Sequence, residues 1–131
     1  MKKGIYLFIV LFLIQCNLTY AVKSCLKKLK SEAKKNWSLS PDKEYYKAGK
    51  LAYELDSAYK PCVIGLTSKQ VEKIFGKPTK TNNKPNQYIY LITPPMREGH
   101  LYCSEVYFTF NSKSIVVRTD IIHSQGGSTD N

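Results

Sequence analysis

The sequence has few of the residues from which catalytic and metal sites are built. Its two histidines are His100 and His123, and its carboxylates are scattered along the chain. No pair of residues has a metal-ligand spacing such as C-x-x-C or H-x-x-x-H. His100 and Cys103 are close in sequence, but an odd offset on a strand points two side chains to opposite faces. We therefore predict a protein that is not an enzyme and that uses no metal, cofactor or small-molecule substrate.

A phosphate-binding loop is also missing. The stretch GLTSKQVEKIFGKPTK, Gly65 to Lys80, has a proline where the motif G-x-x-x-x-G-K-[ST] needs a hydroxyl after its lysine. The same residues predict a short helix from Thr67 to Phe75. Thr67 and Gln70 have the spacing of a capping box, and Gly76 can take the left-handed conformation that ends a helix. Because so short a helix is marginal alone, we expect it to dock on the rest of the fold.

No apolar run is long enough for a confident transmembrane helix. The run from Ile5 to Ile14 is shorter than the about twenty residues that such a helix needs. Lys2 and Lys3 precede it, and Ala21 supplies a small residue at a cleavage position, which is typical of a secretory signal peptide. We predict that residues 1–21 are removed and that the protein is exported to the periplasm or cell envelope.

A second interpretation of the leader is lipoprotein processing at Cys16. Leu13-Ile14-Gln15-Cys16 resembles a lipobox, although the residue before a lipidated cysteine is normally Gly, Ala or Ser. Lipid on Cys16 would tie the protein to a membrane, whereas cleavage after Ala21 would release a soluble exported chain. The rule of a small residue at the cleavage site favours Ala21.

Acidic residues are scarce, with 10 Asp and Glu against 20 Lys and Arg. Residues 22–39 form a basic segment in which Glu32 is the only acid, and its lysines are Lys23, Lys27, Lys28, Lys30, Lys34 and Lys35. Apolar residues recur at helical spacing in this segment: Leu26, Leu29, Ala33 and Trp37. We predict a solvated helix or tether that packs Trp37 on the domain. The alternative is a basic amphipathic helix that lies on an anionic membrane surface.

Residues 40–122 are predicted to form one small α+β domain, followed by a disordered polar tail at 123–131. A helix is expected from Ser40 to Ala58, because Ser40 can cap it and Pro41 suits its first position. Aromatic and β-branched residues predict three strands, Gln87 to Thr93, Leu101 to Phe110 and Ser114 to Ile122. Short connections favour an antiparallel meander. The expected fold is therefore two helices packed on a three-stranded antiparallel sheet, in the order ααβββ.

This order of elements resembles a known family. GLTSKQVEKIFGKPTK, followed by YIYLI and by VYFTFNSKSIVV, is similar to the small outer-membrane assembly lipoproteins known as SmpA, OmlA or BamE. The resemblance covers about Asp42 to Ile122. It implies a sandwich of two helices and three strands, similar to half of the proteinaceous β-lactamase inhibitors. It also implies a role beside the machinery that assembles membrane proteins.

We therefore expect an exported, non-catalytic protein that binds an envelope or outer-membrane protein through its sheet face and the loop that follows Thr93. No nucleic-acid partner is expected. The residues predicted to contact the partner are Tyr88, Tyr90, Arg97, Tyr102 and Tyr107. Tyrosine suits an interface because it offers apolar area and a polar tip, although about half of alternating tyrosines must face the core. Two alternatives are an inhibitor-like module that binds a secreted enzyme and a binder of anionic lipid through residues 22–39.

The cysteines allow more than one disulfide. Once the signal peptide is removed, Cys25, Cys62 and Cys103 remain, which gives three pairings with one thiol left over. The helix from Thr67 must run back along the sheet, which places Cys62 near the start of the second strand. This geometry favours a disulfide between Cys62 and Cys103. Cys25 could pair with Cys62 instead if the basic segment packs back on the domain.

Overall fold

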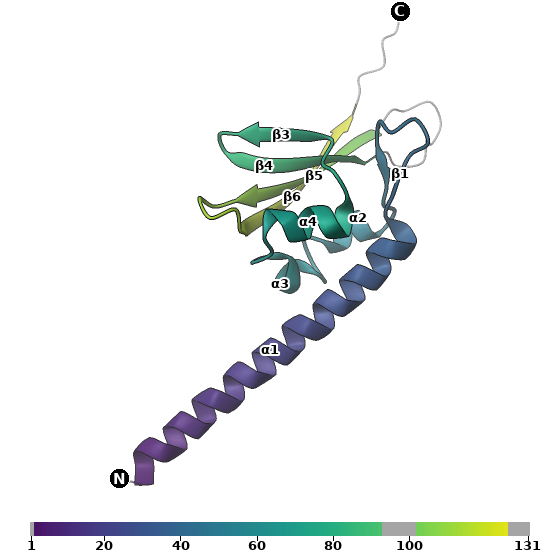
Figure 1. The fold of residues 1–131 in the computed structure, drawn as a ribbon. Coiled ribbons are helices and arrows are strands. Elements are labelled where there is room, and N and C mark those ends of the chain that lie inside the picture. The colour runs from purple at the N-terminus through teal and green to yellow at the C-terminus, as the bar shows by residue number, and fades with distance from the viewer. Residues whose placement is uncertain (1, 93–101, 126–131) are drawn as a thin grey trace, which may run out of the picture.

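In the computed structural model, the described residues form four helices and six strands along the chain (Figure 1). They are α1 (Lys2–Asn36), β1 (Ser38–Leu39), β2 (Tyr46–Lys47), α2 (Leu51–Glu54), α3 (Lys60–Val63), α4 (Ser68–Phe75), β3 (Lys80–Asn83), β4 (Asn86–Ile92), β5 (Tyr102–Phe110) and β6 (Val116–Gln125). The structure describes residues 2–92 and 102–125, apart from the side chains at 2, 16–18, 102, 103, 124 and 125. Helices α2, α3 and α4 lie on one side of the sheet, and α1 extends away from the domain (Figure 1).

The sheet is mixed and has six strands, in the order β1-β2-β4-β5-β6 with β3 also paired to β4. The α+β class is confirmed, and β4, β5 and β6 correspond to the three predicted strands. The prediction of only three antiparallel strands is wrong, because β1, β2 and β3 join them and β2 pairs with β4 in parallel. The first two have two residues each, and β3 is the polar sequence KTNN with every side chain exposed. None of these carries the apolar alternation by which a strand is recognised. Because β6 continues to Gln125, the polar tail also begins later than residue 123.

The helix predicted from Ser40 to Ala58 is mostly absent. Ser40 does not cap a helix but closes a turn, in which its carbonyl accepts a hydrogen bond from the Lys43 amide at 2.9 Å. Lys43 and Gly49 have φ angles of 62° and 50°, which an α-helix cannot contain. Only Leu51–Glu54 is helical in this region. Tyr46 explains the change: as part of β2 it places its ring in the core, where it is 5% exposed.

The leader and the basic segment form one continuous helix of 35 residues, α1. Its C-terminal half packs on the domain through one side, on which Leu29 and Ala33 are buried. Trp37 follows the helix directly and is 8% exposed. The prediction that this segment packs Trp37 on the domain is confirmed.

Helix α4 starts with the predicted capping box and ends at the predicted glycine, although Gly76 combines its positive φ with a ψ of −172° and does not take the left-handed helical conformation. Thr67 accepts a hydrogen bond from the Gln70 amide, and the Gln70 side chain accepts one from the Thr67 amide, which completes the capping box. Gly76 ends the helix with a φ of 82°. A side chain at Gly76 would also collide with the fold, because a Cβ there would lie 2.8 Å from the Tyr46 hydroxyl.

Three aromatic side chains close the C-terminal end of α4. Trp37 Nε1 donates to the Phe75 carbonyl at 2.8 Å, and the Tyr90 hydroxyl donates to the Gly76 carbonyl at 2.8 Å. The Tyr46 hydroxyl donates to the Lys77 carbonyl at 2.6 Å. The last carbonyls of a helix have no partner inside the helix, and Phe75 is the last residue of α4, with Gly76 and Lys77 directly after it. The three bonds therefore give each of these backbone acceptors a donor. The donors come from the end of α1, from β2 and from β4, and the cluster therefore joins three segments to α4.

The disulfide joins Cys25 to Cys62, with their Cα atoms 5.9 Å apart. The predicted pairing of Cys62 with Cys103 is therefore wrong, and the alternative that the sequence left open is the one formed. The reason is that α1 packs back on the helix layer and carries Cys25 to α3. Cys103 lies in β5, where its backbone pairs with Ser124 of β6.

A second glycine, Gly65, allows the cost of the steric contact at Gly76 to be separated from the cost of backbone strain. Gly65 also has a positive φ, of 97°, but no atom lies within 4 Å of where its Cβ would be. We expect Gly65→Ala to lower the free energy of unfolding by about 1 to 2 kcal/mol through backbone strain alone. Gly76→Ala should cost at least about 1 kcal/mol more, since it displaces the Tyr46 hydroxyl from its carbonyl. Urea unfolding compares the two variants, and equal losses would contradict this role of Tyr46.

The disulfide should stabilise the fold substantially, because it closes a separation of 37 residues. We expect Cys25→Ser to lower the free energy of unfolding by about 4 kcal/mol, the value that loop-closure entropy gives. Cys103→Ser serves as the control and should have a smaller effect. Peptide mapping without reduction should recover a Cys25–Cys62 peptide from the wild type, and a Cys62–Cys103 peptide would refute the pairing.

Candidate functional site

The candidate site is the face of the sheet that points away from the helices, called here the outer face. Strand pairing places alternate residues of β4, β5 and β6 on it, together with two from β3. These residues are Lys80, Asn82, Gln87, Ile89, Leu91, Glu105, Tyr107, Thr109, Arg118, Asp120 and Ile122. No described helix lies over this face (Figure 1).

Apolar side chains form the centre of the outer face. This outer patch consists of Ile89, Leu91, Tyr107 and Ile122. Ile89 lies directly opposite Tyr107, and Leu91 lies opposite Glu105, whose other neighbour across the strands is Ile122. Ile122 is 49% exposed, whereas Ile89 is nearly covered by its surroundings. The patch therefore presents a partly exposed apolar surface of the kind found at protein interfaces.

Charged side chains lie within and beside the outer patch. Glu105, which stands between Leu91 and Ile122, accepts a hydrogen bond from the Tyr107 hydroxyl and forms an ion pair with Lys80 at 3.8 Å. Arg118 and Asp120 form a second ion pair at 2.6 Å. Exposed ion pairs contribute little to stability. The outer face thus combines apolar side chains with paired charges.

The tyrosines predicted to contact a partner lie on different faces of the sheet. Tyr107 is on the outer face and is half-buried. Tyr90 is fully buried on the inner face, so the prediction that it contacts a partner is wrong. Tyr88 is also on the inner face, where its ring packs 4.7 Å from that of Phe110 and its hydroxyl donates to Glu72 at 2.7 Å. Tyr107 points to the opposite side of β5 from the buried Val106, Phe108 and Phe110. The sequence did not say which of the tyrosines face the core, because strand pairing and the packing of the helices on one side of the sheet decide it.

Three other predicted positions fall wholly or partly outside the described atoms. Tyr102 belongs to β5 and pairs with Gln125, but its side chain is not described. Arg97 and the loop that carries it lie outside the described residues. Cys16 lies within α1, and its side chain is also not described. Partner contact by Tyr102 or Arg97 and lipidation of Cys16 therefore stay predictions.

Three tyrosines that bond to α4 or to the residues directly after it have a raised pKa, which favours their neutral form. Burial strongly raises the pKa of Tyr90, and burial also raises the pKa of Tyr46. The hydrogen bond to Glu72, followed by burial, raises the pKa of Tyr88. Tyr46 and Tyr90 both donate to carbonyls at the end of α4, so this helix end depends on protonated hydroxyls.

A serine and a histidine meet on the inner face, which sequence spacing alone did not indicate. Ser104 and His123 are opposite each other on β5 and β6, and Ser104 Oγ lies 2.8 Å from His123 Nδ1. The Tyr53 ring stacks on the imidazole at 5.4 Å. Ser104 is only 4% exposed, so its hydroxyl is poorly placed to attack a substrate. The pair satisfies a buried hydroxyl, and the stacking of Tyr53 on His123 joins the end of β6 to α2.

A polar cleft of about 450 Å³ separates α1 from α2. Its polar side chains bond to one another: the Asn36 amide donates to Glu32 at 2.8 Å, and Lys50 pairs with Glu54 at 3.4 Å. Burial raises the pKa of Tyr59 at its edge, and Glu32 and Glu54 raise it further. Across the described part of the chain, no group of three His, Cys, Asp or Glu residues could hold a metal ion. Four of the polar side chains that line the cleft are thus paired with one another.

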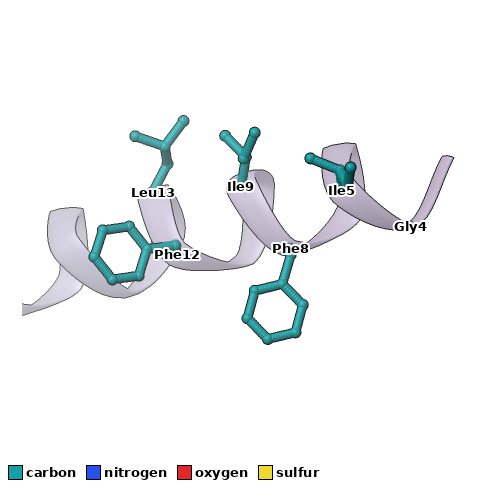
Figure 2. A pocket seen from close by; sticks show the side chains of 6 residues that line it. All are labelled: Gly4, Ile5, Phe8, Ile9, Phe12 and Leu13. Atoms are coloured by element: carbon teal, nitrogen blue, oxygen red, sulfur yellow. The ribbon is translucent and has the colours of Figure 1, made fainter. Parts of the chain in front are cut away.

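The N-terminal half of α1 exposes apolar side chains along its length. Ile5, Ile9 and Leu13 point to one side of the helix, and Phe8 points away from them (Figure 2). Phe8 is 78% exposed. This is the one helix, among the residues described, that is long and apolar enough to cross a membrane, and a signal sequence passes the same test. Its apolar surface suits a lipid or translocation environment better than water.

No family model matches the chain, and no curated protein matches it.

The buried tyrosines predict a loss of stability at high pH. The folded pKa of Tyr90 lies above its unfolded value of about 10, so its contribution is complete below that pH and is lost as the pH rises further. We expect Tyr90→Phe to be less stable than the wild type near neutral pH by about 1 to 2 kcal/mol, because Gly76 loses its donor. Above about pH 10, the wild type should lose stability more steeply than the variant. Urea unfolding between about pH 8 and about pH 11, with thiols blocked, measures both slopes, and parallel curves would contradict the assignment.

Proposed function

We propose that this protein is an exported, non-catalytic component of the cell envelope that binds another envelope or outer-membrane protein through its outer face. The outer patch is the observation that supports this most. Ile89, Leu91, Tyr107 and Ile122 place apolar area on a sheet face that the described helices leave uncovered. A protein interface combines such apolar area with polar and charged groups, which the two ion pairs supply.

Two features support export. The N-terminal half of α1 is compatible with a signal sequence or a membrane span. The disulfide between Cys25 and Cys62 is of the kind that persists in oxidising compartments and is rare in the cytoplasm. Cys25 lies four residues after Ala21, so cleavage at the predicted site would leave the disulfide in the mature chain.

The resemblance to the SmpA, OmlA and BamE lipoproteins supplies the kind of partner that we propose, a protein of the outer membrane or of its assembly machinery. The inhibitor-like alternative stays a prediction that rests on fold analogy alone. The two proposals differ in their partner, a resident envelope protein in one and a secreted enzyme in the other. Both would use the outer face, so the residues tested below apply to either.

The side chains of the outer patch differ in what they would contribute to binding. Tyr107 is held by its bond to Glu105, so binding would cost little additional side-chain entropy. Ile122 is the most exposed apolar residue of the patch and would gain the most from burial. We therefore place the centre of the interface between Tyr107 and Ile122.

A charge introduced into the outer patch should abolish partner binding. We expect Ile122→Glu to weaken binding at least about tenfold, because a carboxylate in a desolvated interface has no partner. The matched control is Leu39→Glu in β1, at a side chain that is 45% exposed against 49% for Ile122. A photoreactive residue at Leu91 should first crosslink the partner in intact cells, and the purified partner is then titrated with each variant.

The outcomes of that titration separate the proposals. Loss in Ile122→Glu with binding retained in Leu39→Glu supports the outer patch. If both variants bind as the wild type does, the patch is not the interface. If the crosslinked partner is a secreted hydrolase that the protein inhibits, the inhibitor-like alternative replaces the envelope partner.

A further inference from the structure

The C-terminal half of α1 presents a dense lysine surface to solvent. Six lysines between residues 23 and 35 are all exposed, and we call them the α1 lysine face: Lys23, Lys27, Lys28, Lys30, Lys34 and Lys35. Glu32, the only acid in this part of the helix, accepts a hydrogen bond from Asn36 at 2.8 Å. The lysine face therefore concentrates positive charge within about three and a half turns of helix.

The other side of the same helix half is occupied by the domain. Leu29 is completely buried, Ala33 is 3% exposed, and Cys25 is bonded to Cys62. The disulfide and Trp37 hold this half of the helix at its two ends. The apolar stripe is thus unavailable for insertion into a bilayer, which excludes the amphipathic mode of membrane binding that the sequence suggested. What remains for a partner is charge, presented on a rigid and already ordered helix.

The position of the lysine face in the chain indicates what it meets. No charged residue occurs from Gly4 to Val22, the apolar half of the same helix. These residues would extend about 28 Å as a helix, close to the about 30 Å of a hydrocarbon core. Lys23 and Lys27 are the first charges after this segment. If that segment spans the membrane, or if Cys16 carries a lipid, the nearest surface to the lysine face is the headgroup layer. Cleavage after Ala21 instead makes the lysine face the N-terminal part of the mature chain, and its charge alone then draws it to that layer.

We propose that the α1 lysine face docks on the anionic phospholipid headgroups of a membrane. Lysines close to an anionic surface are attracted individually, and several acting together give stable association. The order of layers sets the orientation of the docked domain. The buried side of α1 contacts the helix layer, that layer covers the inner face of the sheet, and the outer face lies beyond (Figure 1). Docking therefore turns the outer face away from the bilayer and leaves it open to a protein partner.

This inference uses a surface other than the outer patch, so it can fail or succeed independently of the proposed function. The test variant carries Lys23→Gln, Lys27→Gln, Lys30→Gln and Lys34→Gln. The matched control removes the same charge from exposed lysines elsewhere, with Lys69→Gln, Lys73→Gln, Lys84→Gln and Lys113→Gln. All eight side chains are exposed, and intact folding is checked by circular dichroism and by the Cys25–Cys62 peptide.

Binding is measured by flotation with vesicles of phosphatidylcholine alone or mixed with phosphatidylserine, at low salt. The protein is used with the N-terminus that its cell leaves on it. A retained apolar helix would bind both kinds of vesicle, so only the difference between them is scored. A second readout is the rate at which each lysine is acetylated in the presence of each vesicle, determined by mass spectrometry.

We expect phosphatidylserine to strengthen wild-type binding at least about tenfold, an effect that added salt removes. The four-lysine variant should lose this preference while the control variant keeps it. Acetylation of Lys27 and Lys30 should slow on anionic vesicles, and acetylation of Lys113 should not. No preference in the wild type, or equal losses in both variants, would overturn the proposal. Soluble dextran sulfate, a polyanion without a membrane, is compared with the vesicles at equal total charge. If it protects the same lysines from acetylation more strongly than the vesicles do, the face is a general polyanion site and the proposal is also overturned.

Discussion

The structure depends on how the C-terminal end of α4 is completed. A helix cannot satisfy its own last carbonyls, and here Trp37 donates to the carbonyl of Phe75, the last residue of α4. Tyr90 and Tyr46 donate to the next two carbonyls, those of Gly76 and Lys77 respectively. Each donor is also a large ring in the core, and the ring of Trp37 lies 4.8 Å from that of Phe75. One cluster therefore supplies both hydrogen bonding and apolar burial. It brings together the end of α1, β2, α4 and β4, which are far apart in the chain.

The same cluster fixes the two surfaces to which function is assigned. Trp37 anchors one end of the packed half of α1 and the disulfide at Cys25 anchors the other, so the α1 lysine face is held in a fixed position. Tyr90 anchors β4 with its inner side against α4, and the alternation of the strand then places Ile89 and Leu91 on the outer face. The outer face and the lysine face are consequently at opposite ends of a layered domain. In the proposed arrangement, one holds the membrane and the other meets a protein.

The polar side chains of the interior, among the described residues, are paired within the fold. Polar side chains in the interior bond to one another or to backbone groups, as Ser104 does with His123 and Thr119 does with Asp56 at 3.2 Å. Among the described residues, no buried side-chain nitrogen or oxygen lacks a partner. Groups that are already satisfied serve the fold. The surfaces, with an apolar patch on one and concentrated charge on the other, are where recognition is expected.

The sequence by itself determined the features that depend on neighbouring residues. The capping box of α4, the glycine that ends it, the aromatic strands β4, β5 and β6 and the apolar stripe that leads to Trp37 all follow from local spacing and residue type. Tertiary structure alone decided the rest. The Ser40 to Ala58 pattern was helical, but burying Tyr46 beside Trp37 outweighed that local preference and produced β2. Cys62 pairs with Cys25 because α1 packs back on α3, and Tyr90 rather than Tyr107 is buried because of strand register. These outcomes depend on contacts between segments that are distant in the sequence. The free energy of packing these segments exceeds the local conformational preferences, and it cannot be predicted from any one segment alone.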